Sequence, residues 1–572
     1  MHDYAHEFNQ LGEKFYQQGD YDSARKQFEN ALNIDSENYH SLNNIGVVCA
    51  KLGDYTKAEE HFRKAISVSP TYAEGYNNLG NVLRLAGYQK TAERYLDIAL
   101  NLNPVYEGAL LNLGLVTEDI GNLKKSLKCN EKAYELTRNP EYLSHLYYLK
   151  RRMCDWNGLA EISKKLDKNI STRGETPFIN IFRSDNEKKN YKVAKVWTGN
   201  YKAKKTTRNI TQNTKIRVGY ISETFRDHPV GNCVYEILKY HNKKKFETFV
   251  YSYGVDDGSS IRKFTKKYTG HFFNIRRFDI KRAIHLIKSH NIDILIDLQG
   301  HTKDNRIEIL AGRPAPIQIS YLGFPGTSGT KFIDYLISDK IAAPKSSQRF
   351  YSEKIVYLPR CYQVNSALPV SKKKVTRADF NLPDDKVVFC SFNRSLKIEK
   401  QVFGLWLKIL KAVPDSVLWL YLDNAYIQGN LLSYALQKGA SPERFIFSDR
   451  MTIDKHLARL KLADVALDTF IYSGGATTAN ALRVNVPVVT LRGRHFLSRM
   501  SESILTAVRL NQLVAKNKSD YIKIAVKLAS DKAYYKKTVE IIKKNKKNIF
   551  DTKAFTRDWE NALANICKKH KK

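Results

Sequence analysis

The chain has 572 residues, enough for several domains, and no apolar run in it reaches the roughly 20 residues that cross a bilayer. Its seven scattered cysteines form no CxxC pair, which argues against a disulfide framework or a structural zinc site and favours a reducing, cytoplasmic setting. Lys and Arg total 94 against 58 Asp and Glu, a net charge of +36 that suits an acidic ligand, but no zinc-finger spacing or aromatic-basic RNA-binding motif predicts specific nucleic-acid binding.

A repeat with a period of 34 residues opens the chain. One glycine series falls where two paired helices would touch, and a second falls at the turn between them. The pattern is a tetratricopeptide signature, and it predicts four helix-turn-helix units over residues 1–140 that stack into a superhelix with a concave groove. The series are Gly12, Gly46, Gly80 and Gly114; Gly19, Gly53, Gly87 and Gly121; and the alanines Ala24, Ala58 and Ala92.

Asparagines recur at one position on the first helix of the repeats, whose face would line the groove. Asn44, Asn78 and Asn112 form this ladder. An amide side chain donates and accepts hydrogen bonds at once, so a ladder of them can hold an extended polypeptide without reading its sequence. We therefore predict that an acceptor polypeptide binds along the groove. The competing interpretation is that these side chains only fill a polar slot on the helix surface.

After the repeats, residues 141–212 read as a helical and charged connector that ends in the irregular "NYKAKKTTRNITQNT". From Lys215, short apolar runs alternate with helical stretches in two successive series. Two such series predict two doubly wound, Rossmann-like lobes at 213–370 and 371–548, with ligand bound at the carboxyl ends of the strands, and 549–572 would form a basic tail. The runs are "KIRVGYIS", "FETFVYSYG", "IDILIDLQG" and "PIQISYLGFPG", then "KVVFCSFN", "SVLWLYLD", "RFIFSD", "ADVALD" and "VPVVTL".

Polar side chains follow several strands of the first predicted lobe. His228 lies in "ISETFRDHPVGN", His301 lies in "DLQGHTKDNR", and a glycine-rich loop runs from Gly323 to Gly329. A single histidine after a strand is more often structural than catalytic. Several polar groups at the carboxyl ends of neighbouring strands nevertheless converge on one crevice, so the first lobe is predicted to form one wall of a cleft.

The second predicted lobe carries a cation and a small-residue turn. Lys397 lies in "SFNRSLKIEK" at a loop-to-helix junction, and His456 lies in "DKHLARL". In "LDTFIYSGGATTANALRVNVPVVT" two glycines, an alanine and the pair Thr477-Thr478 separate a strand from a helix. Small residues let the backbone N–H groups of a helix end approach a phosphate closely. The alternative is a tight strand-to-helix turn without a ligand.

These motifs, in this order, resemble the protein O-linked N-acetylglucosamine transferase family, including its plant O-fucosyltransferase relatives and bacterial members. "HPVG" looks like the histidine motif of the family's first lobe, and "GHTKDNRIEILAGRPAPIQISYLGFPGTSG" is similar to its central signature. "FNRSLKI", "LADVALDTFIYSGG" and "VPVVTLRG" match its second-lobe signatures. The resemblance implies tetratricopeptide repeats followed by two Rossmann-type lobes of the GT-B arrangement.

The resemblance also implies an activity: an inverting, cytoplasmic glycosyltransferase that moves a sugar, usually N-acetylglucosamine, from a UDP-sugar to Ser or Thr of a protein. No metal or other cofactor is expected, so Lys397 and the helix end at Thr477 would stabilise the leaving diphosphate, and His228 would orient or deprotonate the acceptor hydroxyl. By analogy with bacterial members, flagellin or another surface protein is the expected acceptor. The implied donor-binding set is Gly323, Gly326, Thr327, Asn393, Arg394, Lys397, His456, Thr477, Thr478 and Asn480, with His301 as a further cleft residue.

The chain departs from the family at two places. Many relatives have Gly-His-Thr-Thr ahead of an Asp, whereas an ungapped alignment gives Gly474-Gly475-Ala476-Thr477 ahead of Asn480 in this chain. In addition, Arg394 stands where relatives usually carry glutamine. These departures leave open a rival hypothesis, a catalytically silent repeat scaffold on a decayed transferase fold. Charge-driven binding of nucleic acid is a second rival.

Overall fold

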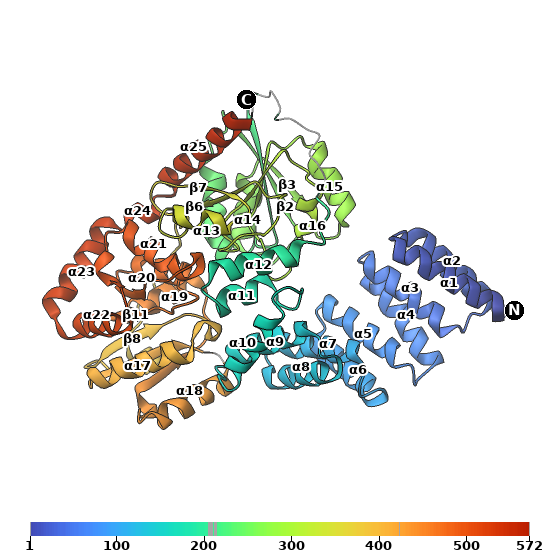
Figure 1. Cartoon of the computed structure of the whole chain (residues 1–572), viewed down its shortest axis with the longest axis horizontal. Helices are drawn as coiled ribbons and strands as arrows, with labels where there is room; N and C mark the ends of the chain where they lie inside the picture. The colour runs from blue at the N-terminus through green and yellow to red at the C-terminus, as the bar shows by residue number, and fades with distance from the viewer. Residues whose placement is uncertain (1, 204–209, 211–213, 423, 571–572) are drawn as a thin grey trace. The chain divides into compact units, whose positions relative to one another are not determined.

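The computed structural model describes residues 2–203, 210, 214–422 and 424–570, which form two compact units, Met1–Leu149 and Lys150–Lys572 (Figure 1). The first unit is entirely helical, and the second contains both sheets. Within the described ranges we find no helix with the length and apolar character needed to span a membrane.

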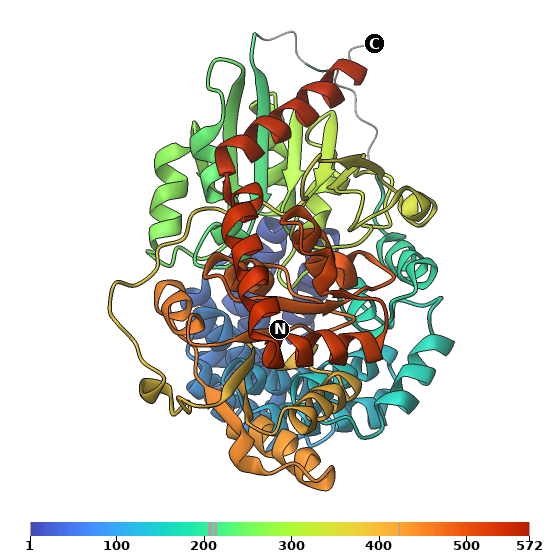
Figure 2. The same cartoon turned by 90° about the vertical axis from the view of Figure 1, so that its left-hand side faces the viewer.

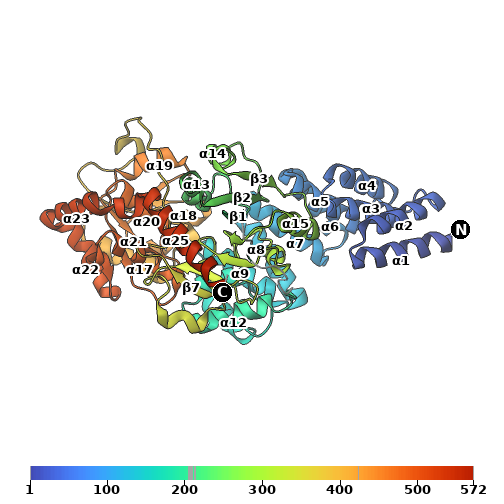
Figure 3. The same ribbon diagram turned by 90° about the horizontal axis from the view of Figure 1, so that it is seen from above.

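The first unit consists of four successive helix pairs, followed by the first residues of α9 (Figures 1 and 3). Glycine permits the close packing within a pair: a Cβ added at Gly46 would lie 2.6 Å from the ring of Phe62. Gly53, between the two helices, has a φ of +82°, which favours glycine. The predicted tetratricopeptide pattern is confirmed. The helices are α1 (His2–Gln18), α2 (Tyr21–Ile34), α3 (Tyr39–Lys51), α4 (Tyr55–Val68), α5 (Ala73–Ala86), α6 (Gln89–Leu102), α7 (Glu107–Asp119), α8 (Leu123–Thr137) and α9 (Pro140–Arg152).

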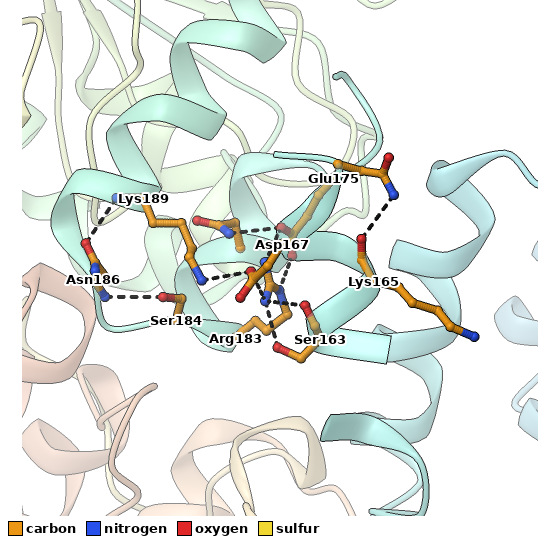
Figure 4. Close-up of polar contacts among 10 residues, drawn as sticks. Ser163, Lys165, Asp167, Glu175, Arg183, Ser184, Asn186 and Lys189 are labelled. Atoms are coloured by element: carbon orange, nitrogen blue, oxygen red, sulfur yellow. Dashed lines mark hydrogen bonds and ion pairs between the residues drawn. The ribbon is translucent and has the colours of Figure 1, made fainter. Parts of the chain in front are cut away.

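The segment predicted as a connector contributes three folded helices to the second unit: α10 (Leu159–Lys168), α11 (Pro177–Arg183) and α12 (Glu187–Thr198). The buried side chain of Arg183 connects parts of this segment through ion pairs. The Arg183 guanidinium donates to both carboxylate oxygens of Glu175, at 2.6 and 2.7 Å, and to Asp167 at 2.8 Å. Lys189 reaches Asp167 from α12, also at 2.8 Å (Figure 4). Most of the irregular stretch predicted near its end lies outside the described residues.

The first lobe is built on a parallel seven-stranded sheet with the order β3-β2-β1-β4-β5-β6-β7. All four predicted strands are present, as β1, β2, β4 and β5, and the strands β3, β6 and β7 extend the sheet at its two edges. The elements are β1 (Ile216–Ser222), α13 (Pro229–Tyr240), β2 (Phe246–Ser252), α14 (Ser260–Tyr268), β3 (His271–Asn274), α15 (Ile280–Ser289), β4 (Ile294–Asp297), α16 (Ile307–Ala311), β5 (Ile317–Ser320), β6 (Tyr335–Ser338) and β7 (Lys354–Tyr357).

The second lobe has a parallel six-stranded sheet with the order β10-β9-β8-β11-β12-β13, which confirms the second predicted series. In both lobes the chain order reverses beside the first strand of the lobe, β1 or β8. Ligands of such sheets bind at this switch point. The elements are β8 (Val387–Ser391), α17 (Lys400–Ala412), β9 (Ser416–Tyr421), α18 (Ala425–Gln437), β10 (Phe445–Ser448), α19 (Ile453–Leu460), β11 (Val465–Leu467), α20 (Ala476–Arg483), β12 (Val488–Leu491), α21 (Met500–Ala507), β13 (Val514–Ala515), α22 (Lys518–Ser530), α23 (Lys532–Asn545) and α24 (Lys547–Phe550).

Within the segment predicted as a basic tail, residues 552–570 form the helix α25 (Thr552–His570), which packs on the first lobe (Figures 1 and 2). Trp559 and Leu563 are fully buried in the core that holds β1. The indole N–H of Trp559 donates to the hydroxyl of Tyr220 at 3.0 Å. The lysines near the end of this segment predicted a basic tail. Its apolar residues nevertheless recur at helical spacing and form a buried face.

Candidate active site

Lys397 lies on a short turn directly after β8, at the switch point of the second lobe. The turn Ser395–Lys397 is a single 3-10 turn that leads into α17. The Lys397 ammonium donates to Asn393 Oδ1 at 3.1 Å and to the carbonyl of Ser473 at 3.2 Å, and it lies 4.1 Å from the centre of the Tyr472 ring. Burial lowers the pKa of Lys397 to about 8, against the opposing effect of the Asp468 carboxylate. The site therefore holds a desolvated cation close to the small-residue turn.

The small-residue turn is organised by Asp468, which follows β11 directly. One carboxylate oxygen of Asp468 accepts from the Gly474 N–H at 2.7 Å, and the other accepts from the Thr490 hydroxyl at 2.7 Å. The turn is tight, since a Cβ added at Gly474 would lie 2.4 Å from Thr478 Oγ1. Gly475 caps α20, so the free N–H groups of the first helical turn begin at Ala476. Lys397 and this helix end thus face the same small region.

A pocket opens beside this turn. Thr477 donates to Asn393 at 3.0 Å within it, and His456 packs edge-on against Phe392 with ring centres 5.0 Å apart. Apolar walls with a few fixed polar groups are typical of small-molecule sites. The pocket is lined by Cys390, Ser391, Phe392, Asn393, His456, Leu460, Ala466, Leu467, Asp468, Thr477, Thr478, Ala481 and Val488.

His456 presents a hydrogen-bond donor in this pocket. Its Nδ1 accepts from the Arg459 Nε–H at 3.3 Å, so the proton of the neutral ring is on Nε2. Burial lowers the pKa of His456 to about 4, and the charge of Arg459 lowers it further, which keeps the ring neutral near pH 7. A ligand with a carbonyl or similar acceptor fits this arrangement.

His228 is the N-cap of α13 and is followed by Pro229, a residue that suits the first position of a helix. Its Nδ1 accepts from the Val230 N–H at 3.2 Å, so the neutral ring carries its proton on Nε2. Burial lowers the pKa of His228 to about 4, with Arg226 and Arg394 acting in the same direction. Arg394, the residue before the Lys397 turn, is thus near enough to His228 to affect its pKa.

The glycine-rich loop of the first lobe is held from inside the lobe. The Thr327 hydroxyl and the Ser328 N–H donate to the buried Glu353 carboxylate at 2.7 and 2.6 Å, and His301 Nε2 donates to the Ser328 carbonyl at 2.8 Å. A Cβ added at Gly323 would lie 2.0 Å from the Leu298 carbonyl. These contacts fix the shape of the loop.

The structure brings only part of the predicted donor-binding set together. Asn393, His456, Thr477 and Thr478 line the pocket beside Lys397. Gly326 and Thr327 instead line a separate pocket, together with Tyr351, His495 and other residues. Asn480 lies half-buried on α20 and is not among the lining residues of either pocket.

In the repeat unit, the predicted ladder lies on the first helix of three pairs, with each side chain half-buried. Asn78 donates to Asn43 Oδ1 at 2.9 Å, and Asn112 donates to Asn77 Oδ1 at 2.8 Å, each reaching the preceding repeat. Asn44 reaches Glu13 at 3.5 Å. Neighbouring repeats are therefore bridged by amide hydrogen bonds, and binding of a polypeptide stays a prediction.

Comparison with known proteins decides the family. The sequence profile of glycosyl transferase family 41 matches residues 188–373 and 363–559, and a tetratricopeptide repeat profile matches residues 5–71. The chain belongs to glycosyl transferase family 41. The expected membership and the expected repeats-plus-two-lobes fold are both confirmed.

Several relatives are about one-third identical to the chain over the aligned residues. The probable UDP-N-acetylglucosamine-peptide N-acetylglucosaminyltransferase SEC of Arabidopsis thaliana is 33% identical over 367 residues, which is 62% of this chain and 37% of that protein. A SPINDLY protein of Petunia hybrida, with the same probable activity in its name, is 31% identical over 385 residues, 64% of this chain and 41% of that protein. The chain thus spans about two fifths of the length of these relatives.

A solved structure of a Thermobaculum terrenum O-GlcNAc transferase variant has the same fold. Its TM-score is 0.65 at 24% sequence identity, and the match covers 99% of this chain and 98% of that one.

Within this family 41 fold, sequence reasoning missed several residues that shape the site. Asp468 organises the small-residue turn, Glu353 holds the glycine-rich loop, and Tyr472 lies against the Lys397 ammonium. A signal for Asp468 was present, because it is an acidic residue directly at the end of a buried strand. Glu353 precedes a strand that no apolar alternation marked, so the sequence offered no comparable signal.

Proposed function

We propose that the chain is a protein O-glycosyltransferase that moves N-acetylglucosamine from its UDP donor to a Ser or Thr hydroxyl of an acceptor protein. The observation that carries this proposal is the buried Lys397 ammonium beside the N-terminus of α20, at the edge of a pocket. A fixed cation and free helix N–H groups stabilise the charge that develops on a leaving diphosphate. The names of the family 41 relatives supply the sugar and the acceptor class.

The donor nucleoside is assigned to the pocket beside Asn393 and His456, whose Nε2–H would meet a carbonyl of the base. The diphosphate then extends toward Lys397 and the N–H groups that begin at Ala476. Because these groups together supply positive charge, we expect transfer to proceed without an added divalent ion, which assays with and without a chelator will test.

His228 is assigned to orient the acceptor rather than to remove its proton. In its neutral form the Nε2 nitrogen carries the hydrogen, so it would donate to an oxygen at the reacting centre. In the reaction the acceptor oxygen bonds to the anomeric carbon, the bond from that carbon to the phosphate oxygen breaks, and the hydroxyl proton passes to water or to the released phosphate. A single displacement of this kind inverts the anomeric carbon.

The competing scaffold hypothesis rests on the departures at Gly475, Ala476 and Asn480. At Gly475 the structure offers a physical reason, since a Cβ there would lie 2.7 Å from Gln363 Oε1. The space that a longer side chain would need is taken by Gln363, while the helix end remains in place. This supports a rebuilt turn rather than a decayed one.

Calorimetry with UDP, followed by measurement of UDP release from UDP-N-acetylglucosamine in the presence of peptide, tests the proposal. We expect UDP to bind to the protein, and we expect UDP to be released from UDP-N-acetylglucosamine when peptide is present. A chain that neither binds UDP nor releases it from any UDP-sugar would support the scaffold hypothesis instead.

A further inference from the structure

The turn that carries Lys397 is held by a segment from outside its own lobe, residues 151–156. Arg151 Nη2 donates to the Leu396 carbonyl at 3.0 Å, and the Trp156 indole N–H donates to the Ile398 carbonyl at 3.2 Å. In the other direction, the Ser395 hydroxyl donates to the carbonyl of Arg152 at 2.6 Å. Hydrogen bonds from this segment thus bracket Lys397 along the chain on both sides.

Arg151 also connects this turn to the small-residue turn. Its guanidinium lies 3.5 Å from the Glu399 carboxylate, and Glu399 in turn accepts from the backbone N–H of Ile471. The side chain of Arg151 is only 5% exposed, and that of Glu399 is 13% exposed. A buried charge pair of this kind depends strongly on each partner, because removing one leaves the other uncompensated.

The lysine turn has few hydrogen bonds of its own. Besides the contacts above, its backbone makes short-range bonds from Lys397 N to the Arg394 carbonyl and from Ile398 N to the Ser395 carbonyl, both 2.9 Å, and the Ser395 carbonyl accepts from the Cys154 thiol at 3.7 Å. Because the turn is only three residues long, the direction of the Lys397 side chain depends on what fixes the turn from outside. The ring of Trp156 is itself held by packing, because it lies edge-on to the ring of Tyr434 on α18 with ring centres 5.1 Å apart.

We propose that Arg151 is a positioning residue for Lys397, and that Trp156 supports it. The segment begins with the last two residues of α9, Arg151 and Arg152, and continues to Trp156, so the chain that follows the repeats supports the lysine assigned to the diphosphate. The inference rests on the proposed function, in which Lys397 binds the diphosphate of the donor. It assigns a function to residues of the connector that contact neither the nucleoside pocket nor the reacting atoms.

The test is a thermodynamic cycle measured by calorimetry with UDP and with uridine. The proteins are the parent, Arg151→Met, Lys397→Ala, the double variant and Lys150→Met. The last is a matched control, because Lys150 is a cation on the same helix turn that pairs with Asp155. We expect Arg151→Met to weaken UDP binding roughly tenfold and to leave uridine binding unchanged, since only the diphosphate meets Lys397. The double variant should bind UDP no more weakly than Lys397→Ala alone, and Lys150→Met should resemble the parent.

Trp156→Phe keeps an aromatic ring and removes the indole N–H donor, so it is expected to fold even where Arg151→Met does not, and to weaken UDP binding roughly threefold. Equal loss of UDP and uridine affinity, or additive losses in the double variant, would overturn the positioning assignment and indicate a structural contribution only. Unchanged UDP affinity in both Arg151→Met and Trp156→Phe would also overturn it. A parent that does not bind UDP, or a Lys397→Ala variant that binds UDP like the parent, would overturn the proposed function and this inference with it.

Discussion

In the second lobe, the side chains at the switch point lie around a pocket and converge on the Lys397 ammonium, whereas the polar groups after β4 and β5 in the first lobe are mostly used within that lobe. Thr327 and Ser328 donate to Glu353, and His301 donates to the Ser328 carbonyl of the same glycine-rich loop. His228 differs from these, because its Nε2–H is not needed for the cap that its Nδ1 provides. This difference is consistent with the proposed function, in which the second lobe would bind the donor and the first lobe would orient the acceptor.

The largest expected effect is that of Lys397→Ala. Removing a preorganised charge at a developing anion costs roughly 10²- to 10³-fold in rate, so kcat for transfer should fall by about that factor. UDP affinity should fall as well, since the same ammonium meets the ground-state diphosphate. Steady-state transfer assays and calorimetry measure the two losses. Parent-like rates in this variant would remove the basis for assigning the donor to the second lobe.

His228→Ala separates the two lobes. We expect transfer to fall roughly 10- to 100-fold, because a donor that orients the reacting oxygens is lost, while UDP affinity stays at the parent value. His228→Asn, which keeps a short side chain able to cap α13, is the matched control for the stability of that helix. If UDP affinity fell together with transfer, the division between the lobes would be wrong.

The repeats add a third region to the comparison. Replacing Asn44, Asn78 and Asn112 together with alanine should reduce modification of whole proteins roughly tenfold or more, with each amide contact worth about 1 kcal/mol. UDP affinity and the modification of short peptides should not change. Because these amides also bridge neighbouring repeats, thermal unfolding of the triple variant is the control. A lower unfolding temperature with normal protein modification would leave only the polar-slot interpretation.

The smallest expected effect is a pH dependence of UDP binding. The pKa of Lys397 is lowered to about 8, so the ammonium is charged below that pH and loses its proton as the pH rises through it. UDP affinity should therefore decline several-fold between about pH 7 and pH 9. In the same titration Lys397→Ala should show no such decline. A decline of equal size in that variant would assign the titration to another group.

The sequence predicted the elements whose residues carry periodic signals. The 34-residue glycine series marked every repeat pair, and apolar runs such as "KVVFCSFN" marked the central strands of both lobes. The edge strand β3 was missed because its four residues, His271–Asn274, are not fully buried, so no continuous apolar run appears there. The helix α25 was not predicted, because the lysines near its end indicated a basic tail although its apolar residues recur at helical spacing.

The candidate site was predictable in part for a similar reason. Side chains in the loops that follow buried strands, such as His228 and Asn393, could be found from the chain order alone. Contacts made by distant segments could not. Nothing near Arg151 in the sequence indicates that its guanidinium reaches Leu396, because that pairing depends on how the connector folds against the second lobe.

The most direct measurement is mass spectrometry of an acceptor protein incubated with UDP-N-acetylglucosamine and either the parent or Lys397→Ala. The account predicts that the parent adds the mass of one or more N-acetylhexosamines to Ser or Thr and that Lys397→Ala adds far less in the same time. Absence of any sugar adduct with the parent across a panel of acceptor proteins, or equal modification by both proteins, would contradict it.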